Sequence, residues 1–153
     1  YIGFKIMSHT KTYGIVPYIV TKKGVKILLC LDVASNDKWG CLKGTKVKNE
    51  TAFMCAKREF FEESSISIDI ELFEEYFEQI NQEKDIGVWL VNSSNIENMD
   101  RYFNGNTLKS EYLSWENSKV KFFSLKKLPK IKSMQKRLVS EIKDFLESKN
   151  LFH

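Results

Sequence analysis

The chain has 153 residues, the size of a single domain, of which 42% are hydrophobic and 29% are charged. These proportions match an ordinary globular domain and exclude a disordered chain, a collagen-like rod and a coiled coil. No apolar run approaches the roughly 20 residues that a membrane-spanning helix needs. We therefore expect one domain over residues 1–153, cytoplasmic and not in a membrane, with residues 1–11 as a candidate N-terminal leader.

The net charge of +4 is unevenly distributed. Lys and Arg outnumber Asp and Glu by 11 to 3 in residues 1–58 and by 10 to 3 in residues 117–153, whereas acidic residues lead by 14 to 3 in between. Such blocks are typical either of a cation site beside an anion-attracting surface or of solvated helix faces and hairpin edges. The three cysteines have no CxxC spacing, which argues against a disulfide framework and a structural zinc site.

The first predicted elements are strands over 14–20 and 25–33, joined by a turn at 22–24. A helix follows from about Thr51, with Asn49 as its expected cap. Its buried face is indicated by the four-residue repeat of Ala52, Ala56 and Phe60, and it ends at Ser64 and Ser65.

The second half alternates short strands with polar loops. We expect a half-buried strand from Ile66 to Ile70, a hairpin formed by 73–79 and 87–92, a polar loop over 92–107 and a strand over 119–125. An amphipathic helix over about 133–149 would bury Met134, Leu138, Ile142 and Phe145. This order predicts an α/β layered domain with a mixed sheet.

The other face of the first helix carries the side chains that suggest chemistry. Glu59, Glu62 and Glu63 stand at i, i+3 and i+4, so three carboxylates share about one turn. Two such charges ~4 Å apart repel by about 4 kcal/mol at an effective dielectric constant near 20. A hard cation, Mg²⁺ or Mn²⁺, would relieve this repulsion. The alternative is an exposed acidic helix face.

The spacing around this triplet is specific. Gly44 is followed after five residues by Glu50 and, after seven more, by the run Arg58-Glu-Phe-Phe-Glu-Glu-Ser-Ser-Ile66. This pattern resembles the Nudix box of the Nudix (MutT-like) hydrolases, and eight of its nine defined positions match. The similarity covers residues 44–66 and is extended by the preceding run WGCLKG at 39–44.

The resemblance implies an α/β/α sandwich with a central mixed β-sheet and a C-terminal helix. It also implies that Glu59, Glu62 and Glu63 ligate the metal, with a further oxygen from the backbone carbonyl of Lys43. Arg58 would pair with Glu50 and orient the helix without binding the metal. Gly44 would let the loop backbone approach the site.

Two positions depart from the family pattern. Ser65 stands where the family has glycine; if the helix closes there with positive φ, serine costs about 1 kcal/mol more than glycine. Leu42 stands where many relatives have proline, which we expect to loosen the loop that leads to Lys43.

The implied activity is metal-dependent hydrolysis of a diphosphate bond in a nucleoside diphosphate-linked substrate, that is, a pyrophosphohydrolase. We expect Arg58, Glu62, Glu63 and Glu116 to form the catalytic set. The general base is Glu59 or Glu62 in the box, or a later carboxylate, with Glu116 preferred over Glu111. A nucleotide-binding or sensor domain with weak catalysis is the alternative.

The expected substrate is a dinucleoside polyphosphate or an RNA 5′ end. The run WGCLKGTK looks more like the corresponding run in RNA-decapping and dinucleoside polyphosphate relatives than in small-nucleotide sanitizers. In this interpretation Lys43 and Lys46 contact phosphates, and Trp39 either stacks on a base or packs in the core. The basic residues of 117–153 would extend an RNA-binding surface.

Overall fold

A computed structural model describes residues 9–149. Along this part of the chain the helices and strands are β1 (Thr10–Thr21), β2 (Gly24–Asp32), β3 (Leu42–Thr45), α1 (Ala52–Ser64), β4 (Tyr76–Gln79), β5 (Lys84–Asn92), β6 (Phe103–Asn104), β7 (Thr107–Leu108), β8 (Asn117–Ser124) and α2 (Lys136–Ser148). Short 3₁₀ turns lie at Ile70–Leu72, Ser93–Asn95, Met99–Tyr102, Ser110–Tyr112, Leu125–Lys127 and Ser133–Gln135.

The strands form one mixed sheet in the order β4-β5-β1-β2-β8-β7-β6. β1 is parallel to β5 and antiparallel to both β2 and β3. Its length lets it serve two partners on one side: Tyr18–Thr21 pair with β2, and Thr12–Ile15 pair with β3. This arrangement places β3, and the loop that follows it, beside the N-terminal half of β1.

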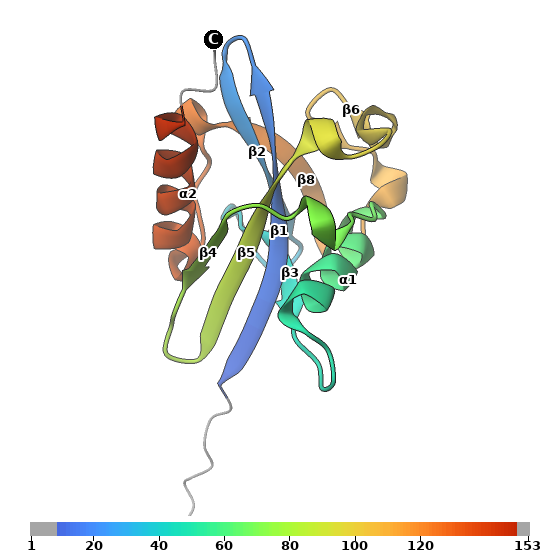
Figure 1. Ribbon diagram of the computed structural model, residues 1–153. Coiled ribbons are helices and arrows are strands. Elements are labelled where there is room, and N and C mark those ends of the chain that lie inside the picture. Colours follow the sequence, from blue (N-terminus) through green and yellow to red (C-terminus); the bar gives the residue numbers. More distant parts are fainter. Residues whose placement is uncertain (1–8, 150–153) are drawn as a thin grey trace, which may run out of the picture.

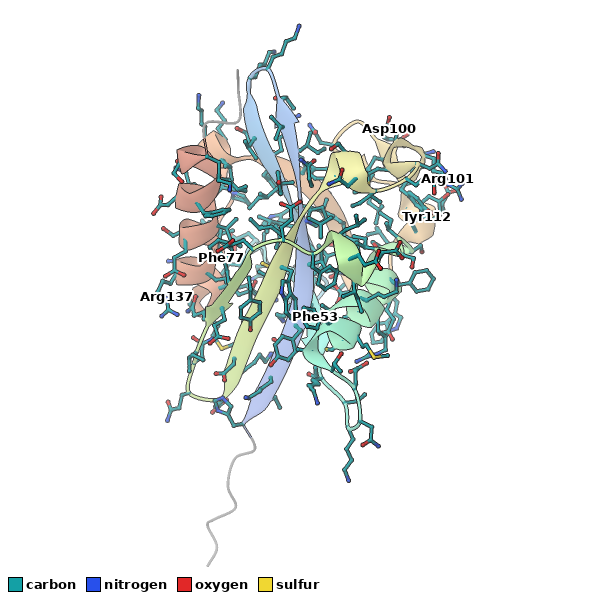
Figure 2. The ribbon with its side chains drawn as sticks, in the orientation of Figure 1. Phe53, Phe77, Asp100, Arg101, Tyr112 and Arg137 are labelled. Carbon is teal, nitrogen blue, oxygen red and sulfur yellow. The ribbon has the colours of Figure 1, made fainter. Side chains whose placement is uncertain are left out.

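Two cores lie on opposite faces of the sheet, one under each helix (Figure 1). Successive residues of a strand point to opposite faces; accordingly Ile15 packs on the α1 side and Val16 on the α2 side. The aromatic residues are divided in the same way: Phe53 packs on Trp89, and Phe77 packs on Phe145 of α2. Figure 2 shows Phe53 at α1 and Phe77 on the side of α2. The predicted α/β/α sandwich with a C-terminal helix is confirmed.

Helix α1 forms as the apolar repeat predicted, with Ala56 and Phe60 fully buried. The predicted cap was wrong: the Thr51 hydroxyl accepts a hydrogen bond from the Met54 N–H at 3.1 Å, which is the N-cap role. Asn49 instead adopts the left-handed conformation, with φ of 66°, in the loop before the helix. At the other end, Ser65 closes the helix with φ 66° and ψ 9°.

Three other predicted elements differ from the structure. The expected polar loop over 92–107 contains 3₁₀ turns at Ser93–Asn95 and Met99–Tyr102 and the short strand β6. Ile66 and Ile68 are buried on the α1 side but belong to no strand, because the chain crosses that core without a neighbouring strand to pair with. The final helix begins at Lys136 and not near residue 133, because residues 133–135 form a 3₁₀ turn that leaves Met134 exposed. Val139 and Leu146 complete the buried face with Leu138 and Ile142.

β1 begins at Thr10, within the range considered as a candidate leader; residues 1–8 lie outside the described residues. Within residues 9–149, neither α-helix has the length and apolar character to cross a membrane.

Candidate active site

The loop after β3 and helix α1 bring the residues of the box together. β3 is held against β1 by the pairs Gly14–Lys43 and Tyr13–Gly44, and α1 packs beside it. The Cys55 thiol, fully buried on α1, donates to the Gly44 carbonyl at 3.4 Å. The start of the loop is thereby tied to the helix that carries the glutamates.

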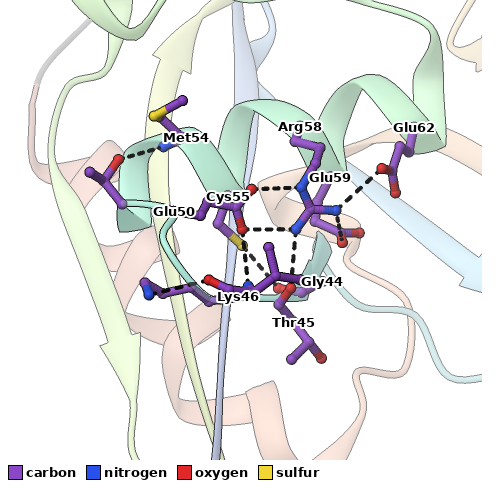
Figure 3. A network of polar contacts seen from close by, with 11 residues as sticks. Gly44, Thr45, Lys46, Glu50, Met54, Cys55, Arg58, Glu59 and Glu62 are labelled. Atoms are coloured by element: carbon purple, nitrogen blue, oxygen red, sulfur yellow. Dashed lines mark hydrogen bonds and ion pairs between the residues drawn. The ribbon is translucent and has the colours of Figure 1, made fainter.

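Arg58 is the centre of a polar network on this helix (Figure 3). Its guanidinium forms a two-point contact with Glu50, at 2.6 Å from Nε and 2.9 Å from Nη2. Nη1 donates to Glu59 at 2.8 Å and to Glu62 at 3.2 Å, and Nη2 donates to the Thr45 carbonyl at 3.2 Å. The planar, always-charged fork of arginine suits this role, which a lysine could not reproduce.

The pairing of Arg58 with Glu50 predicted from the box is therefore present. The hydrogen bond from Arg58 lowers the pKa of Glu50 to about 2, so Glu50 is ionised at any physiological pH. Glu50 also accepts from the Val47 N–H at 3.1 Å. Arg58 and Glu50 together join the loop to the exposed face of α1.

Glu59 lies against the backbone of Gly44. A Cβ at position 44 would overlap the carboxylate of Glu59, so only glycine leaves room for this side chain. The φ of Gly44 is not positive, which means that the glycine is needed for close approach and not for an unusual conformation. Burial raises the pKa of Glu59, although the hydrogen bond from Arg58 opposes the rise.

Glu63 is the most buried carboxylate of the box, with 6% of the residue exposed. Its Oε1 accepts a hydrogen bond from Asn117 Nδ2 at 3.1 Å, and no ion pair within residues 9–149 involves it. Burial raises its pKa to about 8. A buried carboxylate in this state gains from a nearby cation, because the cation offsets the cost of burying its charge.

Glu63 opens onto a cavity of about 370 Å³, which we call the Glu63 cavity. Its polar lining consists of Asp32, Lys43, Glu63, Glu116, Asn117, Lys132 and Gln135. Lys132 forms an ion pair with Asp32 across this lining. The cavity therefore combines carboxylates with two ammonium groups, a combination suited to a cation and a phosphate side by side.

The predicted metal ligands are not gathered at one point. Among residues 9–149 no three acidic, His or Cys side chains are arranged so that they could hold a metal ion together. Glu62 has a largely exposed side chain directed to Arg58, Glu59 is paired with Arg58, and only Glu63 lines the cavity. The oxygen donors present still fit Mg²⁺ or Mn²⁺, since Glu63 is a buried carboxylate that forms no ion pair with any residue the structure describes.

The structure separates the other predicted residues into two groups. Lys43 and Glu116 line the Glu63 cavity, whereas Lys46 and Glu111 do not. Lys46 is half-buried, and its ammonium contacts the Val47 carbonyl at 3.4 Å. Trp39 does not fit the base-stacking role: only 9% of it is exposed, and its ring packs edge-on against Phe123 at 4.6 Å.

Both departures from the box are accommodated. Leu42 does not loosen its loop, because it is fully buried in the α1-side core and pairs with Ile15 in the sheet. Unlike proline, leucine supplies both a backbone N–H and a side chain that fills this core. Ser65 keeps the C-cap: its N–H donates to the Phe61 carbonyl at 2.8 Å, despite the left-handed backbone.

Sequence reasoning missed most residues of the cavity lining, and three of these matter for the site. Asn117 binds Glu63, Lys132 pairs with Asp32, and Trp115 stands on the rim. Only Trp115 had a local signal, its position next to the candidate base Glu116. Asn117 and Lys132 lie far from the box in sequence and come to it only through β8 and the segment before α2.

No protein-family model and no curated protein sequence matches the chain. Solved structures do match. A Nudix hydrolase from Nitrosomonas europaea is 18% identical, with a TM-score of 0.66 over 94% of this chain and 73% of that one. An Ap4A hydrolase from C. elegans is 20% identical, with a TM-score of 0.59 over 91% and 98%. An ADP-ribose pyrophosphatase from Streptococcus suis is 16% identical, with a TM-score of 0.58 over 95% and 96%.

The chain therefore has the fold of the Nudix hydrolases, as the box predicted. At these identities the likeness concerns the fold, and activity has to be argued from the site.

Proposed function

We propose that the protein is a Nudix hydrolase, a Mg²⁺- or Mn²⁺-dependent pyrophosphohydrolase that cleaves a diphosphate bond in a nucleoside diphosphate-linked substrate. The observation that carries the proposal is the assembled box. Arg58 connects Glu50, Glu59 and Glu62; Glu59 occupies the space left by Gly44; and Glu63 faces the cavity. An acidic helix face without a function has no need of such an arrangement.

The proposed roles follow from position and charge. Glu63, which faces the cavity, would hold the metal together with Glu59 and Glu62 once those two side chains turn away from Arg58. When bound, the metal would offset phosphate charge and make water more acidic. Lys43 and Lys132 bind phosphate oxygens at the cavity wall.

Two further residues act around this centre. Arg58 positions the helix. Glu116 accepts the proton from the attacking water, because it lines the cavity and is exposed to the solvent that takes up that proton.

The substrate is a nucleotide in which a diphosphate links two groups, and we propose a dinucleoside polyphosphate or an RNA 5′ end. The similar structures include an Ap4A hydrolase and an ADP-ribose pyrophosphatase, which supports the nucleotide part. A cytoplasmic location remains a prediction.

The proposal that the substrate is an RNA 5′ end is supported by a basic groove next to the Glu63 cavity. Four lysines, Lys38, Lys130, Lys136 and Lys143, line a cavity of about 570 Å³ between residues 128–131 and α2. Lys130 of the groove and Lys132 of the Glu63 cavity are two residues apart. A 5′ phosphate chain bound at Lys43 and Lys132 in the Glu63 cavity would therefore continue along the groove as a polyanion.

The deciding experiment is a panel of nucleotide substrates incubated with Mg²⁺, Mn²⁺ or EDTA, with phosphate detection after phosphatase coupling. We expect turnover with either metal and none with EDTA. Turnover in EDTA would contradict the metal site, and nucleotide binding without turnover of any substrate would favour the sensor domain.

The RNA reading is tested by comparing triphosphorylated RNA with diadenosine tetraphosphate at two salt concentrations. Binding along the groove should give a log–log salt slope of roughly 0.7 per phosphate contacted, and a much smaller slope for the dinucleotide. Cleavage of diadenosine tetraphosphate without turnover of RNA would exclude RNA as a substrate and leave the proposed hydrolase activity intact.

A further inference from the structure

The three tryptophans occupy very different environments. Trp39 and Trp89 are 9% and 8% exposed and pack in the two cores, whereas Trp115 is 85% exposed. Burying an indole is strongly favourable, and Trp115 does not gain this stabilisation within the fold. Trp115 is the most exposed large hydrophobic residue among those the structure describes.

The turn that carries Trp115 is held in place. Within it, the Asn117 N–H donates to the Ser114 carbonyl at 3.2 Å, and the Glu116 N–H donates to the Ser114 hydroxyl at 3.3 Å. From outside, the Val33 N–H donates to the Glu116 carbonyl at 2.8 Å. The exposure of Trp115 is therefore a property of an anchored turn and not of a free loop.

The same turn connects Trp115 to the proposed reaction centre. Asn117, two residues further on, binds the Glu63 carboxylate at 3.1 Å, and Trp115, Glu116 and Glu63 all line the Glu63 cavity. A flat aromatic face thus stands on the rim of a cavity whose wall carries Lys43 and Lys132. When the phosphates of a nucleotide bind at these two lysines, the attached base lies at the rim of the cavity.

We propose that Trp115 is a specificity residue that stacks on a nucleobase of the substrate. The inference rests on the proposed function and adds to it the group that recognises the base, the role that the buried Trp39 cannot fill. Stacking on an indole tolerates every base, because each base has a π-face. It therefore favours nucleotide substrates over inorganic polyphosphates without selecting one base strongly.

A binding experiment tests the contact without catalysis. With Mg²⁺ present, the tryptophan fluorescence of the wild type and of Trp115→Phe is recorded during titration with α,β-methylene-ADP, and with methylenediphosphonate, which lacks a nucleoside. We expect saturable quenching by the nucleotide in the wild type, none in Trp115→Phe, and none by the diphosphonate. Equal quenching in Trp115→Phe, quenching by the diphosphonate alone, or no quenching would overturn the proposal.

Kinetics test the consequence for the substrate. Trp115→Ala should raise KM for a nucleotide substrate by roughly 10-fold or more, since that is the size of one base–aromatic stack. Trp115→Ala should leave kcat nearly unchanged, and Trp115→Phe should have a KM close to that of the wild type. The control is Phe61→Ala, which removes another exposed aromatic ring that lies outside the lining of the Glu63 cavity. An unchanged KM in Trp115→Ala, or an equal rise in Phe61→Ala, would overturn the inference.

The two experiments separate the inference from the function on which it rests. Turnover with unchanged KM in Trp115→Ala leaves the hydrolase standing and removes the stacking role. Trp115-dependent quenching in a protein that turns over no nucleotide removes the hydrolase and keeps the base-binding site.

Discussion

The carboxylate of Glu59 occupies the space that a side chain on residue 44 would need. The two residues are 15 positions apart, on β3 and on α1, and their contact sets how closely the helix approaches the loop. Gly44 is therefore part of the site through its missing Cβ.

Replacing Gly44 by alanine should displace the Glu59 carboxylate, since the two cannot share that space. We expect a folded protein whose kcat is about 100-fold lower, the usual cost of misplacing a catalytic group by about 1 Å. The control is Thr45→Ala, which keeps the carbonyl that accepts from Arg58 and should retain activity. A Gly44→Ala enzyme with wild-type kcat would show that the position of Glu59 does not matter.

Ser65→Gly should stabilise the protein by up to about 1 kcal/mol, because Ser65 has a left-handed backbone that glycine adopts without strain. The loss of the 3.4 Å hydrogen bond from its hydroxyl to the Tyr112 carbonyl offsets part of the gain. The measurement is the midpoint of denaturant unfolding.

The neighbouring change Ser64→Gly should act in the opposite direction. Ser64 is a buried helical residue whose hydroxyl donates to the Phe60 carbonyl at 2.7 Å. A stability loss at both positions would mean that the Ser65 hydroxyl matters more than its backbone.

Glu63 should make the metal-free protein less stable as the pH rises. Its folded pKa, about 8, is above the ordinary value of 4.5, so the folded state holds a proton that the unfolded state has released between these values. The associated stability is fully present below pH 4.5 and lost as the pH rises through about 8, a change on the order of a few kcal/mol.

Denaturant unfolding in EDTA between pH 5 and pH 8 measures this change. Glu63→Gln should flatten the profile and hold the fold at pH 8, while lowering turnover roughly 100-fold because an anionic metal ligand is lost. Added Mg²⁺ should stabilise the wild type at pH 8 more than Glu63→Gln. A profile unaffected by the substitution would contradict the assignment.

Glu116 and Glu111 offer a matched pair for identifying the general base. Only Glu116 lines the Glu63 cavity, although both are exposed. Glu116→Gln should lower kcat by roughly 100-fold, whereas Glu111→Gln should leave it unchanged. If the two substitutions have equal effects, or if Glu116→Gln has none, the general base is a glutamate of the box.

Much of the site could be predicted from the sequence because the box is local. Its residues lie on one short strand, one loop and one helix, so fixed spacing along the chain determines which face each side chain occupies. The resemblance to the Nudix box implied the pairing of Arg58 with Glu50 and, through the glycine of the family, a left-handed backbone at Ser65.

Only the tertiary structure decided which residues complete the cavity. Asn117 reaches Glu63 across 54 positions, and Lys132 reaches Asp32 across 100. Neither approach has a signature in sequence spacing, because both depend on the order of strands in the sheet. The environments of Trp39 and Trp115 were likewise decided only by the tertiary structure. Both are tryptophans beside the site, but sheet packing buries the first, whereas an anchored turn holds the second in solvent at the cavity rim.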